Sequence, residues 1–193
     1  MTREQWLLEA TEHFRPWFAE NEFPLPEQLR ISVGFAKRSS QHAIGTCYIS
    51  AAAEDGIHQI FIAPTIKDPI TVLATTLHEL IHAADDGKSK HRGDFARVAK
   101  AMGLTGKMTA TVPGESLMLD LEAIANKLGE YPHGILVPSQ GGTGSGKVGG
   151  QTTRMILVQA DCCGYKARTT RKWLDSLGAP SCPCGTVMEE QVK

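Results

Sequence analysis

A glycine-rich stretch in the second half of the chain is the feature that most limits how this sequence can fold. Residues 138–153 read PSQGGTGSGKVGGQTT and contain six glycines. A segment of this composition behaves as a flexible linker and supplies no apolar face to a core. The sequence therefore predicts two domains, residues 1–137 and residues 154–193, joined by a linker at residues 138–153.

The same stretch contains GGTGSGK, a pattern typical of the start of a phosphate-binding loop. The full motif needs Ser or Thr after the lysine to hold magnesium, and here Val148 follows Lys147. The glycines that come next also disfavour the helix that must follow such a loop. We therefore expect no nucleotide cofactor.

The overall composition excludes several classes of protein. Of the 193 residues, 41% are hydrophobic and 21% are charged, as in ordinary globular proteins. No apolar run approaches the roughly 18 residues of a membrane span, and the first residues lack the apolar block of a secretory signal. We expect a cytoplasmic protein with no membrane partner.

Charge and cysteine are distributed unevenly along the chain. Residues 1–144 carry 13 basic against 17 acidic side chains, whereas residues 145–193 carry 7 against 4. The basic excess of the second part favours an anionic partner for it. Four of the five cysteines lie within residues 162–184. In a chain without an export signal, such a cluster favours a metal site over disulfide bonds.

Hydrophobic periodicity predicts an α+β fold for the first domain, with a small antiparallel sheet. The apolar spacing of the first helix is interrupted by Pro16, which we expect to kink or divide it. The last two strands are expected to form a hairpin around a turn at residues 54–56. Asp68 is the expected N-cap of the longest central helix, and Gly87 is its expected C-cap. The expected strands are residues 29–35, 44–49 and 58–62, and the expected helices are residues 3–20, 68–87, 94–102 and 115–128.

The central helix carries the motif with the clearest chemistry. Residues 78–82 read HELIH, and four residues correspond to about 400° of helix rotation, so His78 and His82 project from nearly the same side. This spacing lets two imidazoles bind one zinc ion, while Glu79 acts as a general base on a zinc-bound water. The alternative is an amphipathic helix with two incidental histidines. The grouping of three polar residues beside an apolar stripe favours the zinc site.

A catalytic zinc ion needs a third protein ligand and an open fourth position. Asp85 lies on the same helix only three residues after His82. Its carboxylate is therefore too close to His82 along the helix to complete a tetrahedral coordination of the zinc ion. His91 follows a turn that contains Gly87, and a helix–turn–helix return would bring it over the ion. We therefore expect His91 to be the third ligand. The candidates considered are His91, Asp85, Asp86, Glu115 and His133.

Together these segments resemble the SprT-like metallopeptidases, which include the Spartan-type DNA–protein crosslink proteases. The resemblance rests on HELIHA, a short polar turn, HRGDF and a helix that ends at Gly-Leu. It covers residues 25–105 and, more loosely, residues 155–186. The family's third zinc ligand matches His91, which implies that His91 is a ligand and that Phe95 packs beside it. The resemblance implies a zincin-like fold and a zinc endopeptidase that acts on DNA-associated proteins, in the style of bacteriophage or bacterial members.

The cysteine pairs of the second domain are typical of the knuckles of a zinc ribbon, which many family members also carry. The pairs are CC and CxC, where CxxC is the usual spacing. Adjacent cysteines in an extended strand point to opposite faces, so all four reach one zinc ion only if the first turn is bulged. The alternatives are a structural zinc site and a degenerate ribbon that binds zinc weakly or not at all. The four candidate ligands are Cys162, Cys163, Cys182 and Cys184.

Between the cysteine pairs lies a run of cations and aromatic side chains without an acidic residue. Such a run suits contacts with a phosphate backbone and a stacked base. A solvated ribbon surface is the alternative, and the family resemblance favours single-stranded or duplex DNA. The candidate nucleic-acid-binding residues are Lys166, Arg168, Arg171, Lys172 and Trp173.

The sequence therefore predicts a zinc-dependent endopeptidase that acts on a protein substrate. One rival is a non-enzymatic, zinc-stabilised nucleic-acid or transcription-associated factor, in which Asp85 or another fourth ligand closes the site. A second rival is a zinc hydrolase with a substrate that is not a peptide.

Overall fold

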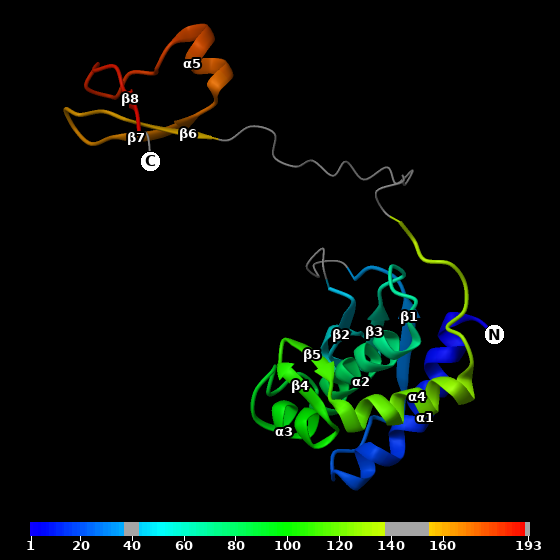
Figure 1. Ribbon diagram of the computed structural model, residues 1–193. Coiled ribbons are helices and arrows are strands. Elements are labelled where there is room, and N and C mark those ends of the chain that lie inside the picture. The colour runs from blue at the N-terminus through cyan, green and yellow to red at the C-terminus, as the bar shows by residue number, and fades with distance from the viewer. Residues whose placement is uncertain (37–42, 138–154, 192–193) are drawn as a thin grey trace. The chain divides into compact units, whose positions relative to one another are not determined.

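The structure, a computed structural model, describes residues 1–36, 43–137 and 155–191 (Figure 1). The chain divides into two compact units, Met1–Gly141 and Gly142–Lys193, which we call the N-terminal and C-terminal units and describe separately. The predicted linker, with its GGTGSGK pattern, lies outside the described residues. No helix in the described ranges is long and apolar enough to cross a membrane.

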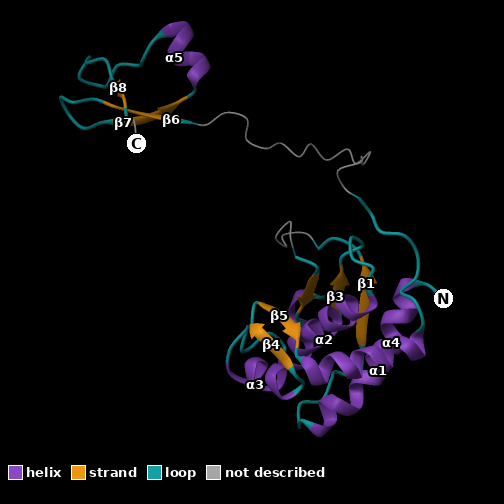
Figure 2. Cartoon of the chain, in the orientation of Figure 1, coloured by secondary structure: helices purple, strands orange, loops and turns teal. Residues whose placement is uncertain are grey.

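The N-terminal unit mixes helices with two small sheets, which confirms the predicted α+β class (Figure 2). Each predicted helix is present within a few residues of its expected bounds. Its helices are α1 (Arg3–Glu20), α2 (Pro69–Asp85), α3 (Gly93–Ala101) and α4 (Glu115–Leu128), with a short 3-10 helix η1 (Ser50–Ala52). Its strands are β1 (Leu29–Val33), β2 (Gly45–Tyr48), β3 (His58–Ile62), β4 (Leu104–Lys107) and β5 (Ala110–Pro113).

The first helix begins with a reciprocal capping box. The Thr2 hydroxyl accepts a hydrogen bond from the Gln5 backbone N–H, and the Gln5 side chain accepts one from the Thr2 backbone N–H. Pro16 lies inside α1 without dividing it. Phe14 and Phe18, on either side of Pro16, are fully buried and hold this turn of the helix against the core.

The main sheet has the strand order β1-β3-β2, with β3 in the middle (Figure 1). Strands β2 and β3 pair antiparallel, as predicted, but β1 pairs with β3 in parallel. The prediction of an antiparallel sheet is therefore wrong for β1. Apolar alternation identifies the buried face of a strand and not its direction, and the parallel register places Ile31 opposite Ile60, both buried.

Helix α2 is the centre of the N-terminal unit and packs against β2, β3, α1, α3, α4 and β5. Its fully buried side chains include Leu73, Leu77, Leu80 and Ile81. Asp68 caps its N-terminus, as predicted, by accepting a hydrogen bond from the Thr71 backbone N–H. The predicted C-cap is one residue off, because Asp86 takes that position with a left-handed backbone (φ 48°).

A hairpin that the sequence did not predict, β4–β5, follows α3. Its strands pair antiparallel and are joined by the two residues Met108 and Thr109. The segment LTGKMTATVP has little apolar alternation. The hairpin is held instead by tertiary contacts, since Leu104 is buried and Met108 packs against the main core.

The C-terminal unit is built on a three-stranded antiparallel sheet of order β7-β6-β8. Its core consists of the buried residues Val158, Ala160, Cys182 and Met188. A short helix, which the sequence did not predict, begins after Thr170 and packs Leu174 against this core. The elements are β6 (Ile156–Gln159), β7 (Lys166–Thr169), α5 (Arg171–Leu177) and β8 (Glu189–Glu190).

Candidate metal sites

The structure brings together the three histidines that the sequence analysis singled out. His78 and His82 project from α2, and His91 lies in the loop between α2 and α3. Their candidate ligand nitrogens all lie within 4.8 Å of one another. The Nε2 atoms of His82 and His91 are 3.1 Å apart. Two nitrogens that bind one tetrahedral zinc ion would lie about 3.3 Å apart, so this spacing suits ligands of a common ion.

Phe95, on α3, forms an apolar support for all three imidazoles. Its ring stacks on His82, with the centroids 4.3 Å apart and the planes at 27°. It meets His78 and His91 edge to face, with centroid distances of 5.0 and 5.1 Å. Because Phe95 is fully buried, it restricts the positions that the three imidazoles can take.

The histidines of this cluster are held in their neutral form. Burial, followed by the neighbouring His82 and His91, lowers the pKa of His78 to about 3. Burial, followed by His91, lowers the pKa of His82 to about 4. Burial also lowers the pKa of His91. At neutral pH each ring therefore has a free lone pair, which is the form that binds a metal.

Glu79 lies beside the cluster but outside the group of candidate ligands. Its side chain is buried, with 6% of the residue exposed, and burial raises its pKa to about 8. The Cys47 backbone N–H donates a hydrogen bond to it and acts in the opposite direction. A carboxyl group with this pKa can hold or release a proton near neutral pH.

Strand β2 approaches Glu79 so closely that only glycine fits at position 45. A Cβ atom on Gly45 would lie 2.6 Å from Glu79 Oε1 and 2.6 Å from Thr75 Cγ2. These distances are well inside van der Waals contact. The missing side chain of Gly45 therefore leaves the space that the Glu79 carboxylate occupies.

Two adjacent aspartates hold the loop that carries His91. Asp85 accepts hydrogen bonds from both the backbone N–H and the hydroxyl of Ser89, at 2.8 Å for the hydroxyl. Asp85 was a candidate third ligand, but its carboxylate is used within the loop and is not part of the histidine cluster.

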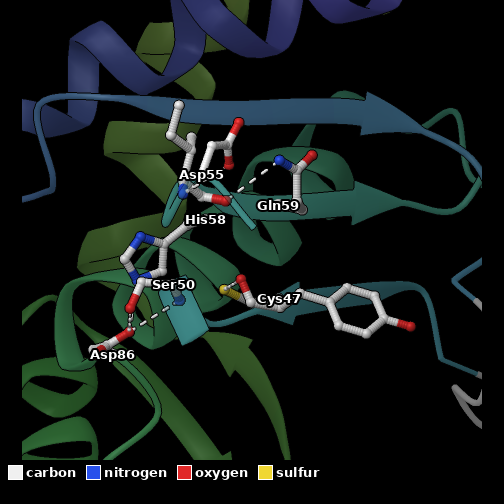
Figure 3. Close-up of polar contacts among 8 residues, drawn as sticks. Cys47, Ser50, Asp55, His58, Gln59 and Asp86 are labelled. Carbon is white, nitrogen blue, oxygen red and sulfur yellow. Dashed lines mark hydrogen bonds and ion pairs between the residues drawn. The ribbon is translucent and has the colours of Figure 1, made fainter. Parts of the chain in front are cut away.

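Asp86 fastens the same loop to the main sheet (Figure 3). Its Oδ1 accepts hydrogen bonds from the Ser50 backbone N–H at 3.1 Å and hydroxyl at 2.9 Å, and lies 3.0 Å from His58 Nε2. Burial alone would raise the pKa of Asp86, but these hydrogen bonds together lower it. Gly87 follows with φ 67°, and a Cβ there would lie 2.6 Å from Ile49 Cγ2, so the loop also needs a glycine at this point.

The remaining third-ligand candidates lie elsewhere in the described part of the chain. Glu115 begins α4 and is exposed. The side chain of His133 is exposed, and its backbone carbonyl accepts a hydrogen bond from Arg3. Neither belongs to the histidine cluster.

The four cysteines of the C-terminal unit also come together. Their Sγ atoms all lie within 4.8 Å of one another, and those of Cys162 and Cys182 are 3.4 Å apart. Cys162 and Cys163 lie in a turn closed by a hydrogen bond from Gly164 N–H to Ala160 O, at 2.8 Å, and not in an extended strand. Cys162 and Cys163 are therefore not held on opposite faces of a strand, and the four sulfur atoms can converge.

One cysteine of this cluster, Cys182, has a thiol pKa well below the usual value. Burial would raise its pKa, but hydrogen bonds from the Cys162 thiol and from two backbone N–H groups lower it to about 6. A thiolate at neutral pH is the form in which cysteine binds a metal. The cluster can therefore hold a metal ion.

The basic residues of the C-terminal unit do not all have the same surroundings. Lys166 and Arg168 are exposed at alternate positions of β7 and so share one face. Trp173 is 50% exposed, and the Lys172 ammonium lies 5.2 Å from the centre of its ring. Arg171 instead pairs with Glu190 at 2.6 Å, which offsets its charge.

Thr111 is a residue of the histidine site that the sequence analysis missed. Its hydroxyl lies 2.9 Å from His78 Nδ1 and comes from the unpredicted hairpin, 33 residues further along the chain. Nothing in the local sequence marks this threonine, because its role depends on how the hairpin packs against α2.

Comparison of the chain with protein-family models, curated protein sequences and solved structures found no match.

Proposed function

We propose that the N-terminal unit is a zinc-dependent endopeptidase of the SprT-like type, with a zincin-like fold. The observation that carries the proposal is the convergence of His78, His82 and His91 beside a buried glutamate that is not itself a candidate ligand. Three neutral imidazoles and a neighbouring acid–base group are the parts of a catalytic zinc site.

The residues present fit a zinc ion. His78, His82 and His91 would hold it, and zinc accepts three nitrogen ligands with a fourth position left for a water molecule or the substrate. When bound, zinc supplies a Lewis acid that polarises a carbonyl group and makes water more acidic. A divalent cation nearby would also favour the charged form of Glu79 and lower its pKa from about 8.

Glu79 would move the proton. Its carboxylate would take a proton from the attacking water and then deliver it to the nitrogen of the leaving amine. The Cys47 N–H and the space left by Gly45 hold the carboxylate in place during both steps. Burial excludes bulk water from this carboxylate, which keeps its pKa near the working pH.

The position of β2 favours a polypeptide as the substrate. Strand β2 is at the edge of the main sheet among the described residues, and Gly45 and Cys47 of this strand lie against Glu79. Extended peptides commonly bind by adding a strand to the edge of a sheet. A peptide bound along β2 would carry its backbone past the general base.

The surroundings of Asp85 weigh against a closed, non-enzymatic site. That rival needs a fourth protein ligand, and Asp85 was the nearest candidate. Its carboxylate is hydrogen-bonded twice to Ser89, and in the described ranges the cluster contains three histidines and no acid.

For the C-terminal unit we propose a structural zinc ion on the four cysteines and contact with DNA through β7 and Trp173. The exposed Lys166, Arg168 and Lys172 would meet phosphates, and Trp173 would stack on a base. Arg171 contributes less to this proposal than the sequence suggested, because of its pairing with Glu190. The substrate would then be a protein bound to DNA.

Proteolysis by the zinc-loaded full chain tests this proposal. A basic protein bound to single-stranded DNA, the same protein without DNA and a small ester serve as substrates. We expect cleavage of the DNA-bound protein, and a loss of about 10²–10⁴-fold in Glu79→Gln with zinc retained. Glu122→Gln, which alters an exposed glutamate of α4, is the matched control. Unchanged activity in Glu79→Gln, hydrolysis of the ester alone, or no cleavage by a chain that holds zinc would contradict the proposal.

A further inference from the structure

We infer that Thr111 is a positioning residue for the histidine cluster, whose hydroxyl turns the His78 ring so that Nε2 faces the other two histidines. The inference rests on the metal-binding part of the proposed function. Nδ1 of His78 lies 2.9 Å from Thr111 Oγ1. A histidine that binds a metal through one ring nitrogen commonly donates its other N–H to a second group, which orients the ring.

The chemistry of a neutral imidazole connects this hydrogen bond to metal binding. Such a ring has one N–H and one nitrogen with a lone pair. When Nε2 of His78 offers its lone pair to an ion, the proton is on Nδ1 and is donated to Thr111 Oγ1. Within the described part of the chain, Thr111 is the one residue outside the cluster that hydrogen-bonds a ring nitrogen of these histidines.

The β4–β5 hairpin holds Thr111 at a defined distance from α2. Across the hairpin, Thr111 is paired with Gly106, and β5 packs directly against α2. Leu104 anchors the base of the hairpin in the core, and Met108 anchors its tip. Because both ends of the hairpin are anchored, the Thr111 hydroxyl stays in place and can restrict the rotation of the His78 ring.

Among the described residues, no side chain outside the cluster hydrogen-bonds the ring of His82 or His91. Both rings pack against Phe95 instead. The hydroxyl of Thr111 therefore complements Phe95, since an aromatic face limits the position of a ring and a hydrogen bond selects which nitrogen points inward. A substitution that removes the Thr111 hydroxyl but keeps the side-chain volume would preserve the packing of the His78 ring. It would lose the hydrogen bond that determines which ring nitrogen faces the other histidines.

Cobalt titration of the metal-free full chain separates this role from general stability. Three variants are compared with the wild type: Thr111→Val removes the hydroxyl, Thr111→Ser keeps it, and Thr105→Val makes the same change elsewhere on the hairpin. The Thr105 hydroxyl donates to the Val112 carbonyl at 3.2 Å, within the hairpin itself. Thiolate-bound cobalt has charge-transfer absorption that histidine-bound cobalt lacks, so the two clusters are read separately.

We expect Thr111→Val to weaken cobalt binding at the histidines by about 10–100-fold. Thr111→Ser and Thr105→Val should bind cobalt at the histidines with wild-type affinity. The charge-transfer absorption of cobalt at the cysteines should be the same in all four proteins. In the zinc-loaded chain, nitrogen-15 spectra should place the His78 proton on Nδ1, and that proton should exchange faster in Thr111→Val.

Wild-type affinity in Thr111→Val would overturn the inference. An equal loss in Thr111→Ser or Thr105→Val would overturn it as well, because volume or hairpin stability would then determine the affinity. A wild-type chain that binds no cobalt at its histidines would reject the proposed metal site itself, and the inference would fall with it.

Discussion

Replacement of Gly45 by alanine tests whether the position of Glu79 is set by its contact with β2. An alanine Cβ at this position would lie 2.6 Å from Glu79 Oε1, whereas ordinary contacts with a Cβ begin at 3.4 Å. The backbone of Gly45 does not have the left-handed conformation that would itself exclude alanine. The conflict is therefore purely steric. Because Thr75 Cγ2 would also lie 2.6 Å away, either β2 or both the Glu79 and Thr75 side chains must move by about 0.8 Å.

The expected loss of activity follows from this displacement. A misplacement of about 1 Å at a reacting group can lower the rate by about 10²-fold. We therefore expect Gly45→Ala to reduce kcat/KM for a protein substrate by about 10–100-fold. The zinc content should be unchanged, because the three atoms nearest to the added Cβ belong to Glu79 and Thr75 and not to the histidines. Overpacking of this kind should also reduce the free energy of unfolding by about 1–3 kcal/mol.

The matched control is Gly34→Ala, at the residue that directly follows β1 of the same sheet. A Cβ at Gly34 would meet Phe61 Cδ1 at 3.7 Å, which is an ordinary contact. This variant should keep both activity and zinc. Full activity in Gly45→Ala would refute the reasoning, and so would a loss of zinc, which would show that β2 supports the metal ligands and not the base.

Three further predictions concern protonation, metal removal and DNA. Burial and the neighbouring His82 and His91 lower the pKa of His78 from 6.5 to about 3. Between these values the folded state binds fewer protons than the unfolded state, so the urea midpoint of the metal-free chain should fall as pH decreases through this range, and His78→Gln should flatten the fall. Cys182→Ser should abolish the protection of backbone amides from hydrogen exchange throughout the C-terminal unit and leave the N-terminal unit protected. The reason is that a core of four buried side chains cannot replace the roughly 10–16 kcal/mol of a structural zinc ion. Retained protection in the metal-free wild type would contradict this. Lys166→Ala should reduce the log–log salt slope of single-stranded DNA binding by about 0.7, and Arg171→Ala, with its partner Glu190, should change it less; equal slopes for the wild type and Lys166→Ala would reject the contact.

The parts of the fold that depend on local periodicity could be predicted from the sequence. Helix α2 has apolar residues at regular helical spacing and a capping aspartate, so its position and the shared side of His78 and His82 follow from short-range geometry. The return of His91 was also foreseeable, because the segment between two predicted helices is short and contains Gly87.

The features that the sequence did not predict depend on contacts between distant residues. Alternation in β1 identifies its buried face, but its parallel pairing with β3 depends on which strand of the β2–β3 hairpin it lies beside. The C-cap at Asp86 exists because Ser50 and His58, from other elements, satisfy its carboxylate. Thr111 reaches His78 only through a hairpin whose stability comes from the core and not from its own sequence pattern.

The unequal supports of the three histidines have a consequence for the kinetics of metal exchange. His78 and His82 belong to the most buried helix of the unit, so neither can leave the site unless the core opens. His91 lies on a loop with positive φ at Asp86, Gly87, Lys90 and Gly93, which is held at one end by two carboxylates. The loop that carries His91 can therefore open while the helical pair stays in place. The opening of this loop, and not the unfolding of the unit, would set how fast a metal held by the three histidines exchanges.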